Sequence, residues 1–452
     1  MYVKSLQLDD VKSFADLSFD FERPDKSFAG WTVLVGGNSS GKSTVLKSIA
    51  LALMGPESSR ELLGSPSTWD GWIRKTQKRS SINLELSWDQ SADGFRRTGA
   101  NPGKQFESGV RFLLETKETD VAGQKPYPVL RPVYRETANR TKIRTPERGP
   151  WDPNARGWFS AGYGPMRRLT GSSSDSVRLS LGRGAVSRFV TLFREDAALS
   201  ESETWLKTAH SRWLETQDSA QKDFLDNISE FLSDGLLPGG MKITRVTVDD
   251  VFISDPEGLE LPMRDISDGC RGVYATVLDL VHGMSTVYGS TDLFKRDQNG
   301  RVIVDKPGVV LIDEIEAHLH PSWQRDIPEW FKSHFPKIQF LVTTHSPLVA
   351  QAADENGIFL LPSAKDINGK PRQLDAEEVN RLRLGRAEKT LLGVAFGLKT
   401  VRSTWANWQI EKWKKLNAKQ KAGVPFAGGE QEEFLSLRPQ MEVAFDQTIP
   451  VV

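Results

Sequence analysis

The sequence has a single cysteine, no net charge and no long apolar run. Because Cys270 is the only cysteine among 452 residues, an internal disulfide framework is excluded and a reducing compartment is expected. The 59 Lys and Arg residues balance 59 Asp and Glu residues, so nucleic acid would have to bind a local basic patch. No apolar run approaches the roughly 18 residues that cross a bilayer, and Met1 leads into a strand-like segment without a secretory signal. We therefore expect a soluble, cytoplasmic protein with no membrane partner.

The stretch from Trp31 to Thr44 predicts a phosphate-binding site. Its apolar run, residues 31–35, is typical of a buried strand, and residues 36–43 (GGNSSGKS) have the spacing of a phosphate-binding loop that opens a helix. Lys42 is expected to contact the β- and γ-phosphates of ATP, and the Ser43 hydroxyl to bind Mg²⁺. A Gly/Ser-rich turn that fits this spacing by chance is expected in about 2% of cases. The residues predicted to bind nucleotide in this stretch are Gly36, Asn38, Gly41, Lys42, Ser43 and Thr44.

Two further apolar runs end in polar side chains. Residues 308–312 precede Asp313 and Glu314, and residues 340–344 precede His345. Runs of this kind are typical of strands buried in a parallel sheet, whose carboxyl ends bind ligands. We expect Asp313 to hold Mg²⁺ through water, Glu314 to orient or deprotonate the attacking water, and His345 to donate to the γ-phosphate. The alternatives are a plain acidic turn and a histidine that serves only packing or the surface.

A short cap precedes another helix. Ser267-Asp-Gly269 lies before a helical run that extends to about residue 287, with the serine as an N-cap and the glycine allowing close backbone approach. Such a cap alone is weak evidence of function. Its meaning depends on the motifs that accompany it.

Residue periodicity divides the chain into four expected regions. Residues 1–170 form an N-terminal lobe with the phosphate loop, 171–240 a helical insertion, 241–365 a C-terminal lobe, and 366–452 a C-terminal helical region for partner docking. No apolar heptad persists in the insertion over three or four repeats, so a long coiled-coil arm is excluded.

Basic residues gather in two places. Residues 131–148 contain six Lys and Arg against two Glu, which indicates either a nucleic-acid contact or a solvated loop whose arginines pair with local acids. Arg167 and Arg168 follow an expected strand, where they would face a nucleotide or a partner subunit, or lie on the surface as ordinary charges. Both pairs of alternatives stay open from sequence alone.

The C-terminal region has an aromatic helix. Trp405, Trp408, Trp413 and Leu416 fall roughly on one face, which indicates a helix packed on the core or a helix that docks a partner. The tail, residues 422–452, is rich in Gly, Pro and acidic residues, so we expect a loosely ordered extension or another partner-binding segment.

In this order, the motifs at 36–43, 266–271, 310–321 and 343–347 closely resemble those of soluble ATP-binding-cassette ATPases. Within these the chain looks like the branch that contains the overcoming-lysogenization-defect nucleases, the RecF proteins and the double-strand-break repair ATPases. The resemblance covers residues 1 to about 365. It implies an α/β fold: a P-loop ATPase head with a β-rich N-terminal lobe, a helical insertion and C-terminal helices.

The resemblance also implies a homodimer or a higher homo-oligomer. ATP and Mg²⁺ would lie between the phosphate loop of one subunit and Ser267 and Gly269 of the other. Where the family commonly has glutamine or glutamate, this chain has Cys270, which leaves Arg271 as the polar contact and is compatible with low turnover. The family has a glutamine that contacts magnesium, and four residues are candidates for it here: Gln77, Gln90, Gln105 and Gln124. Residues 158–168 are a candidate for the lobe that carries this glutamine.

No nuclease motif is found after residue 361, so any cleavage of nucleic acid would need a separate protein. A stand-alone cassette ATPase of this layout is similar to the ATPase subunits of antiphage systems, first Septu and second PARIS. The resemblance implies a slowly hydrolysing ATPase that acts as sensor and regulatory scaffold and controls an effector nuclease of the HNH type. The alternatives are a RecF-like DNA-repair ATPase and the nucleotide-binding subunit of a membrane transporter.

Overall fold

The computed structural model describes residues 1–64, 69, 71–96, 102–115, 127–136, 142–182, 184–363, 366, 369–393, 395–396 and 400–445. These residues form two compact units, and the division between the units falls after Ala387. No helix in the described ranges is both long and apolar enough to span a bilayer.

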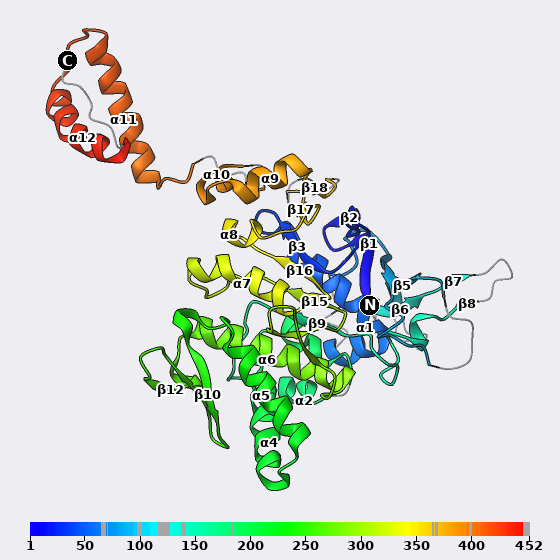
Figure 1. Ribbon diagram of the computed structural model, residues 1–452. Helices are drawn as coiled ribbons and strands as arrows, with labels where there is room; N and C mark the ends of the chain where they lie inside the picture. The colour runs from blue at the N-terminus through cyan, green and yellow to red at the C-terminus, as the bar shows by residue number, and fades with distance from the viewer. Residues whose placement is uncertain are drawn as a thin grey trace. The chain divides into compact units, whose positions relative to one another are not determined.

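A six-stranded sheet forms the centre of the first unit (Figure 1). Its order is β18-β17-β3-β16-β15-β9, and every neighbouring pair is parallel except β17 with β18. Its strands are β3 (Gly30–Val35), β9 (Ser160–Tyr163), β15 (Gly308–Ile312), β16 (Ile338–Thr343), β17 (Ile358–Leu360) and β18 (Arg372–Gln373). Since β15 and β16 are buried at every position, the expected continuous apolar strands of a parallel sheet are confirmed.

A second sheet is antiparallel and has the order β2-β1-β4-β5-β6. Its strands are β1 (Tyr2–Val11), β2 (Phe14–Asp20), β4 (Arg79–Ser87), β5 (Gln105–Glu115) and β6 (Tyr127–Val133). Along β4, Ile82, Leu84 and Leu86 are buried while the residues between them are half-buried. This alternation is the sequence pattern that predicts a strand with one face on the core, so the β-rich lobe is confirmed.

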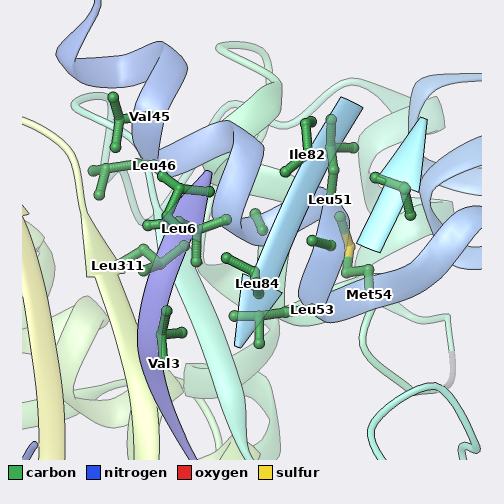
Figure 2. Packing of buried hydrophobic residues seen from close by; sticks show 14 of the residues in the cluster. Val3, Leu6, Val45, Leu46, Leu51, Leu53, Met54, Ile82, Leu84 and Leu311 are labelled. Atoms are coloured by element: carbon green, nitrogen blue, oxygen red, sulfur yellow. The ribbon is translucent and has the colours of Figure 1, made fainter. Parts of the chain in front are cut away.

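Helix α1 (Lys42–Leu63) joins the two sheets through one apolar cluster. Figure 2 shows Leu51, Leu53 and Met54 of α1 beside Ile82 and Leu84 of β4. The backbone leaves the helical conformation at Gly55, with φ 76°, and helical residues resume after it. A Cβ atom at this glycine would lie 2.6 Å from the ring of a tryptophan, so the break also admits that ring.

Helices cover the rest of the first unit. They are α2 (Ser174–Ser180), α3 (Val190–Phe193), α4 (Ser200–Thr216), α5 (Ser219–Ser233), α6 (Asp268–Tyr288), α7 (Pro321–His334), α8 (Pro347–Ala350) and α9 (Ala376–Leu384). Small sheets are built from β7 (Arg135–Glu136) with β8 (Lys142–Ile143), β10 (Lys242–Val246) with β11 (Val251–Ser254) and β12 (Glu260–Pro262), and β13 (Phe294–Arg296) with β14 (Val302–Val304). The expected helices of the insertion are thus present as α2 to α5.

The second unit contains α11 (Thr404–Lys421) and α12 (Glu430–Phe445), which pack against each other (Figure 1). Leu416, Phe434 and Leu437 are buried together between them. The expectation of a loosely ordered tail is therefore wrong for residues 430–445, which form a helix whose Phe434, Leu437 and Met441 are buried on one face. Helix α10 (Ala387–Leu392) begins at the boundary between the units.

The boundaries of the four expected regions stay predictions. The first compact unit extends to Ala387, so it includes residues 366–387, which the sequence analysis grouped with the C-terminal region. Strand β18 and helix α9 explain this assignment, since β18 pairs with β17 at the edge of the six-stranded sheet.

Candidate nucleotide-binding site

The loop between β3 and α1 closes around the ammonium group of Lys42. Its Nζ donates to the carbonyl oxygens of Gly36 at 2.9 Å and Gly37 at 3.1 Å. Gly41 has φ 91°, and a Cβ atom there would lie 2.3 Å from the ring of Phe14. Only glycine suits this position, because it tolerates a positive φ and leaves room for the ring. The local backbone therefore matches the predicted phosphate loop.

A buried hydroxyl in this loop fits a phosphate ligand. The Oγ atom of Ser40 is buried and has no hydrogen-bond partner among the described residues, and the residue is only 3% exposed. Leaving a buried hydroxyl unpaired costs about 1–3 kcal/mol, which an incoming acceptor such as a phosphate oxygen would offset. Ser43 and Thr44 lie in the first turn of α1, where helix N–H groups lack partners, and Asn38 is exposed in the loop. Their contacts to ATP stay predictions.

Asp313 and Glu314 follow β15, and Thr343 at the end of the adjacent β16 holds both. The Thr343 hydroxyl donates to Asp313 Oδ1 at 2.5 Å and accepts the backbone N–H of Glu314 at 2.8 Å. Asp313 is 4% exposed, whereas Glu314 is half-buried. The parallel pairing of the two strands brings these residues together, as the sequence predicts.

Glu314 has an unusual backbone conformation. Its φ is 46°, in the left-handed region that non-glycine residues seldom adopt. Such conformations persist where the surrounding structure holds them, and they gather at functional sites. The turn from β15 therefore aims the Glu314 side chain by a constrained backbone.

Arg167 lies beneath this turn. Its guanidinium is buried and donates to the carbonyl oxygens of Gly164 at 2.8 Å, Asp313 at 2.9 Å, Glu314 at 3.0 Å and Ile315 at 3.1 Å. Burial lowers the pKa of Arg167 to about 10, although the nearby carboxylates oppose that shift. Of the alternatives open from sequence, a surface charge is excluded for Arg167.

The neighbouring Arg168 is different. It is exposed, and its guanidinium donates to the carbonyl oxygen of Glu195 at 2.7 Å. It therefore matches the ordinary surface charge that the sequence left open for this pair.

His345 is exposed beside the same acidic turn. Its backbone N–H donates to the carboxylate of Glu316, whose other oxygen accepts the Thr344 hydroxyl at 2.7 Å. Glu316 therefore ties the end of β16 to the turn after β15. Glu316 was not among the predicted site residues, although a second carboxylate two residues after Glu314 was a visible signal in the sequence.

The phosphate loop and the acidic turn share one electrostatic environment. Burial lowers the pKa of Lys42, and the carboxylates of Asp313, Glu314 and Glu316 oppose that shift. The structure thus brings together Lys42 with the predicted magnesium and water-activating residues. This grouping is the arrangement that phosphoryl transfer requires, a cation beside carboxylates at the ends of adjacent strands.

The cap of α6 lies against the loop that follows the acidic turn. A Cβ atom at Gly269 would lie 2.3 Å from the carbonyl oxygen of His318, so this glycine permits close packing. Ser267 is exposed and its hydroxyl donates to Cys270 Sγ at 3.1 Å. Arg271 donates to the carbonyl oxygen of Arg264 and pairs with the Asp268 carboxylate. Contact of Ser267, Gly269 and Arg271 with a nucleotide of a second subunit stays a prediction.

A cavity of about 530 Å³ adjoins the phosphate loop. Among its lining residues are Ser39 and Ser40 of the loop, with Lys12, Phe14 and Arg74 from the antiparallel sheet and its turns. Burial, with Lys47 nearby, lowers the pKa of Lys12. The volume is in the range of small-ligand sites. This cavity was not predicted from the sequence, because outside the phosphate loop its lining residues come from a strand end and short turns that carry no motif.

The four glutamine candidates remain unassigned. Gln105 lies in β5 and accepts from Lys4 Nζ at 3.0 Å, while Gln77 and Gln90 are exposed in turns. Gln124 lies outside the described residues. Strand β9 pairs with β15 beside Asp313. The Asp313 N–H donates to the carbonyl oxygen of Tyr163, the last residue of β9, at 2.8 Å.

Two arginines of the basic segment 131–148 form ion pairs with nearby acids. Arg131 binds Glu115 at 3.0 Å and Arg144 binds Glu147 at 3.6 Å. These contacts favour the solvated-loop alternative for both arginines. Arg140 lies outside the described residues, as do the side chains of Arg135 and Lys142.

Two family models match the chain. One, described as "AAA domain", matches residues 5–147, and the other, described as "AAA domain, putative AbiEii toxin, Type IV TA system", matches residues 170–350. The first contains the phosphate loop, and the second contains the α6 cap, the acidic turn and His345. A P-loop ATPase domain with an α/β fold, as expected from the sequence, is therefore confirmed.

Two relatives are similar in sequence to this chain over most of its length. The chain is 24% identical over 361 residues to the Septu protein PtuA of Bacillus mycoides (strain KBAB4), covering 80% of this chain and 40% of that relative. It is 25% identical over 409 residues to the Retron Ec83 probable ATPase of Escherichia coli, covering 80% of this chain and 72% of the relative. The expected similarity to the Septu ATPase subunit is confirmed, and this chain spans less than half of that protein's length.

A solved structure also matches. The SmcHead bound to the C-winged helix domain of ScpA aligns with a TM-score of 0.47 and 16% identity, covering 84% of this chain and 99% of that chain.

Proposed function

We propose that the chain binds ATP with Mg²⁺ and hydrolyses it slowly. The observation that carries this proposal is the grouping of Lys42, the unpaired Ser40 hydroxyl and the Asp313–Glu314 turn at one edge of the parallel sheet. An anion-binding loop beside adjacent carboxylates supports phosphoryl transfer to water. The matches to AAA domains and to proteins described as probable ATPases support the same activity.

Each side chain has a proposed role. Ser43 and Asp313 hold the magnesium ion, which would neutralise phosphate charge, and Lys42 binds the β- and γ-phosphates. Glu314 orients or deprotonates the attacking water, held by its constrained backbone and by Thr343. His345, exposed at the end of β16, donates to the γ-phosphate as charge develops.

The active form is proposed to be a homodimer or higher homo-oligomer. Ser267 is exposed at the start of α6, while its own hydrogen bond stays within that segment. An exposed cap next to a helix N-terminus offers an anion-binding surface that a second copy's nucleotide would complete. Ser267, Gly269 and Arg271 would supply that surface.

The biological role proposed is sensor and regulatory scaffold of a prokaryotic antiphage defence complex. The similarity to the Septu protein PtuA and to retron ATPases supports this role. A separate effector nuclease of the HNH type is the proposed partner, and nucleotide state would bias the complex through its differential affinity for two assemblies. Co-expression with an HNH protein encoded beside it, followed by co-purification in ATP and in ADP, tests this partnership.

The ATPase proposal is tested by nucleotide binding and phosphate release. Lys42→Ala should abolish binding of ATP, because the loop loses the cation that faces its phosphates. Lys222→Ala, which removes an exposed lysine of α5, is the matched control and should bind and hydrolyse ATP as wild type. Equal turnover in wild type and Lys42→Ala would contradict the proposed site.

A further inference from the structure

Arg167 makes three hydrogen bonds to the turn that carries Asp313 and Glu314, and no sequence motif predicts this role. Its two terminal nitrogens donate to the backbone carbonyls of three consecutive residues, Asp313, Glu314 and Ile315, and to that of Gly164. Three consecutive carbonyls converge on one group only when the chain curves around it. The guanidinium therefore occupies the inside of the turn that presents Glu314.

The chemistry of arginine suits this position. A guanidinium has donors fixed in a planar fork and remains charged, so it can bind several carbonyl oxygens at once in one geometry. Glu314 has φ 46°, a conformation that needs support from its surroundings. The hydrogen bonds from Arg167 lie on both sides of that residue and supply such support.

Arg167 also contacts the helix that begins at the Ser267 cap. A Cβ atom at Gly272 of α6 would lie 3.0 Å from the carbonyl oxygen of Arg167. The backbone of Arg167 thus packs against α6 while its side chain binds the acidic turn. One residue connects two parts of the site that are far apart in sequence.

We propose that Arg167 is a positioning residue for ATP hydrolysis. It fixes the turn that carries Glu314 and ties that turn to the first turns of α6. This inference rests on the proposed ATPase function and adds to it a residue that acts through Glu314, with no contact to the nucleotide required.

A buried arginine can instead contribute to the stability of the fold alone. The chain contains a second arginine that serves as the control for that alternative. Arg188 is half-buried, burial likewise lowers its pKa to about 10, and it donates to the carbonyl oxygens of Ser160 and Gly184. It does not bind the acidic turn. Arg167→Met and Arg188→Met therefore remove similar groups from different places.

The experiment measures kcat, ATP affinity and thermal stability of both variants. Arg167→Met should lower kcat by about 100-fold, as small misplacements of reacting groups do, and leave ATP affinity within about 3-fold of wild type. Arg188→Met should lower Tm but keep kcat within about 3-fold. Equal kcat in the two folded variants would overturn the proposal.

Two further measurements decide the remaining cases. If Arg167→Met does not fold, Arg167→Lys keeps the charge without the fork and should still lose about 10-fold in kcat; wild-type kcat would overturn the proposal. Amide hydrogen exchange of residues 314–316 should be faster in the Arg167 variant than in Arg188→Met, and equal exchange would overturn the positioning role. Because exchange needs no turnover, a wild type without ATPase activity would contradict the proposed function alone.

Discussion

The hydroxyl of Thr343 decides how two carboxylate residues are presented. It donates to the Asp313 side chain and accepts from the Glu314 backbone, so a single side chain sets both distances. Threonine is β-branched and stiff at χ1, which suits a strand and fixes the direction of the hydroxyl. At the scale of single residues, the site depends on this support as much as on the acids.

Thr343→Val is the direct test of this support. Valine keeps the shape but removes both hydrogen bonds, which should lower the free energy of unfolding by about 1–3 kcal/mol. Turnover should fall about 10- to 100-fold because the carboxylates lose their orientation. Phosphate release and urea unfolding measure the two effects.

A second buried threonine provides the control. Thr276 of α6 donates only to a backbone carbonyl one turn earlier, at 2.7 Å, so Thr276→Val should affect stability but not turnover. Unchanged turnover in Thr343→Val would show that the hydroxyl does not orient the acids.

At the scale of elements, α4 of the insertion is joined to α6 by a ring stack. His282 of α6 stacks on Trp205 of α4 at 4.4 Å, with 18° between the ring planes. Burial lowers the pKa of His282 from 6.5 to about 4, so the neutral ring is favoured in the folded protein. The insertion is therefore held to the ATPase lobe by a contact that acid should weaken.

The sign of this effect is set by proton binding. Between pH 6.5 and 4 the unfolded chain binds a proton at His282 that the folded chain does not, so stability is fully present above pH 6.5 and is lost as pH falls. The drop in Tm from pH 7 to pH 5 should be larger in wild type than in His282→Phe. Differential scanning calorimetry measures it, and equal drops would contradict the assignment.

Asp279, one turn before on α6, should behave in the opposite way. Burial raises the pKa of its carboxyl to about 6, so its contribution is present at low pH and is lost as pH rises through 6. Asp279→Asn should therefore change the pH dependence of Tm in the reverse sense to His282→Phe.

The helical pair of the second unit gives a prediction of its own. Leu437 is 4% exposed between α11 and α12, whereas Leu435 on the same helix is 57% exposed. Leu437→Ala should lower the free energy of unfolding of this unit by about 2–5 kcal/mol, and Leu435→Ala should change it little. Hydrogen exchange across residues 404–421 measures the difference, and equal protection in both variants would contradict the packing.

At the scale of the whole molecule, sequence reasoning succeeded where chemistry is local. The phosphate loop and the strands before Asp313 and His345 follow from contiguous residues whose spacing carries the chemistry. The hydrogen bonds by which Arg167 supports the acidic turn were not predictable. Asp313 lies 146 residues after Arg167 in the sequence, and the two meet only after the sheet forms.

Helix α12 was not predicted from the sequence for a different reason. In α12, the acidic and Gly/Pro-rich composition favoured a disordered tail, and Pro439 lies inside the helix. The spacing of Phe434, Leu437 and Met441 nevertheless follows one helical face, and all three are buried. Tertiary packing against α11 overrides the local composition.

The central claim is that one ATP site combines the phosphate loop of one copy with the exposed Ser267 segment of another. The measurement that tests it most directly is ATP turnover in a mixture of Lys42→Ala and Ser267→Arg proteins, each inactive alone. Recovery of roughly a quarter of wild-type turnover is predicted, because half of randomly mixed dimers are mixed and each has one intact site. Turnover no greater than that of the separate variants, with both proteins folded and exchanging subunits, would contradict the account.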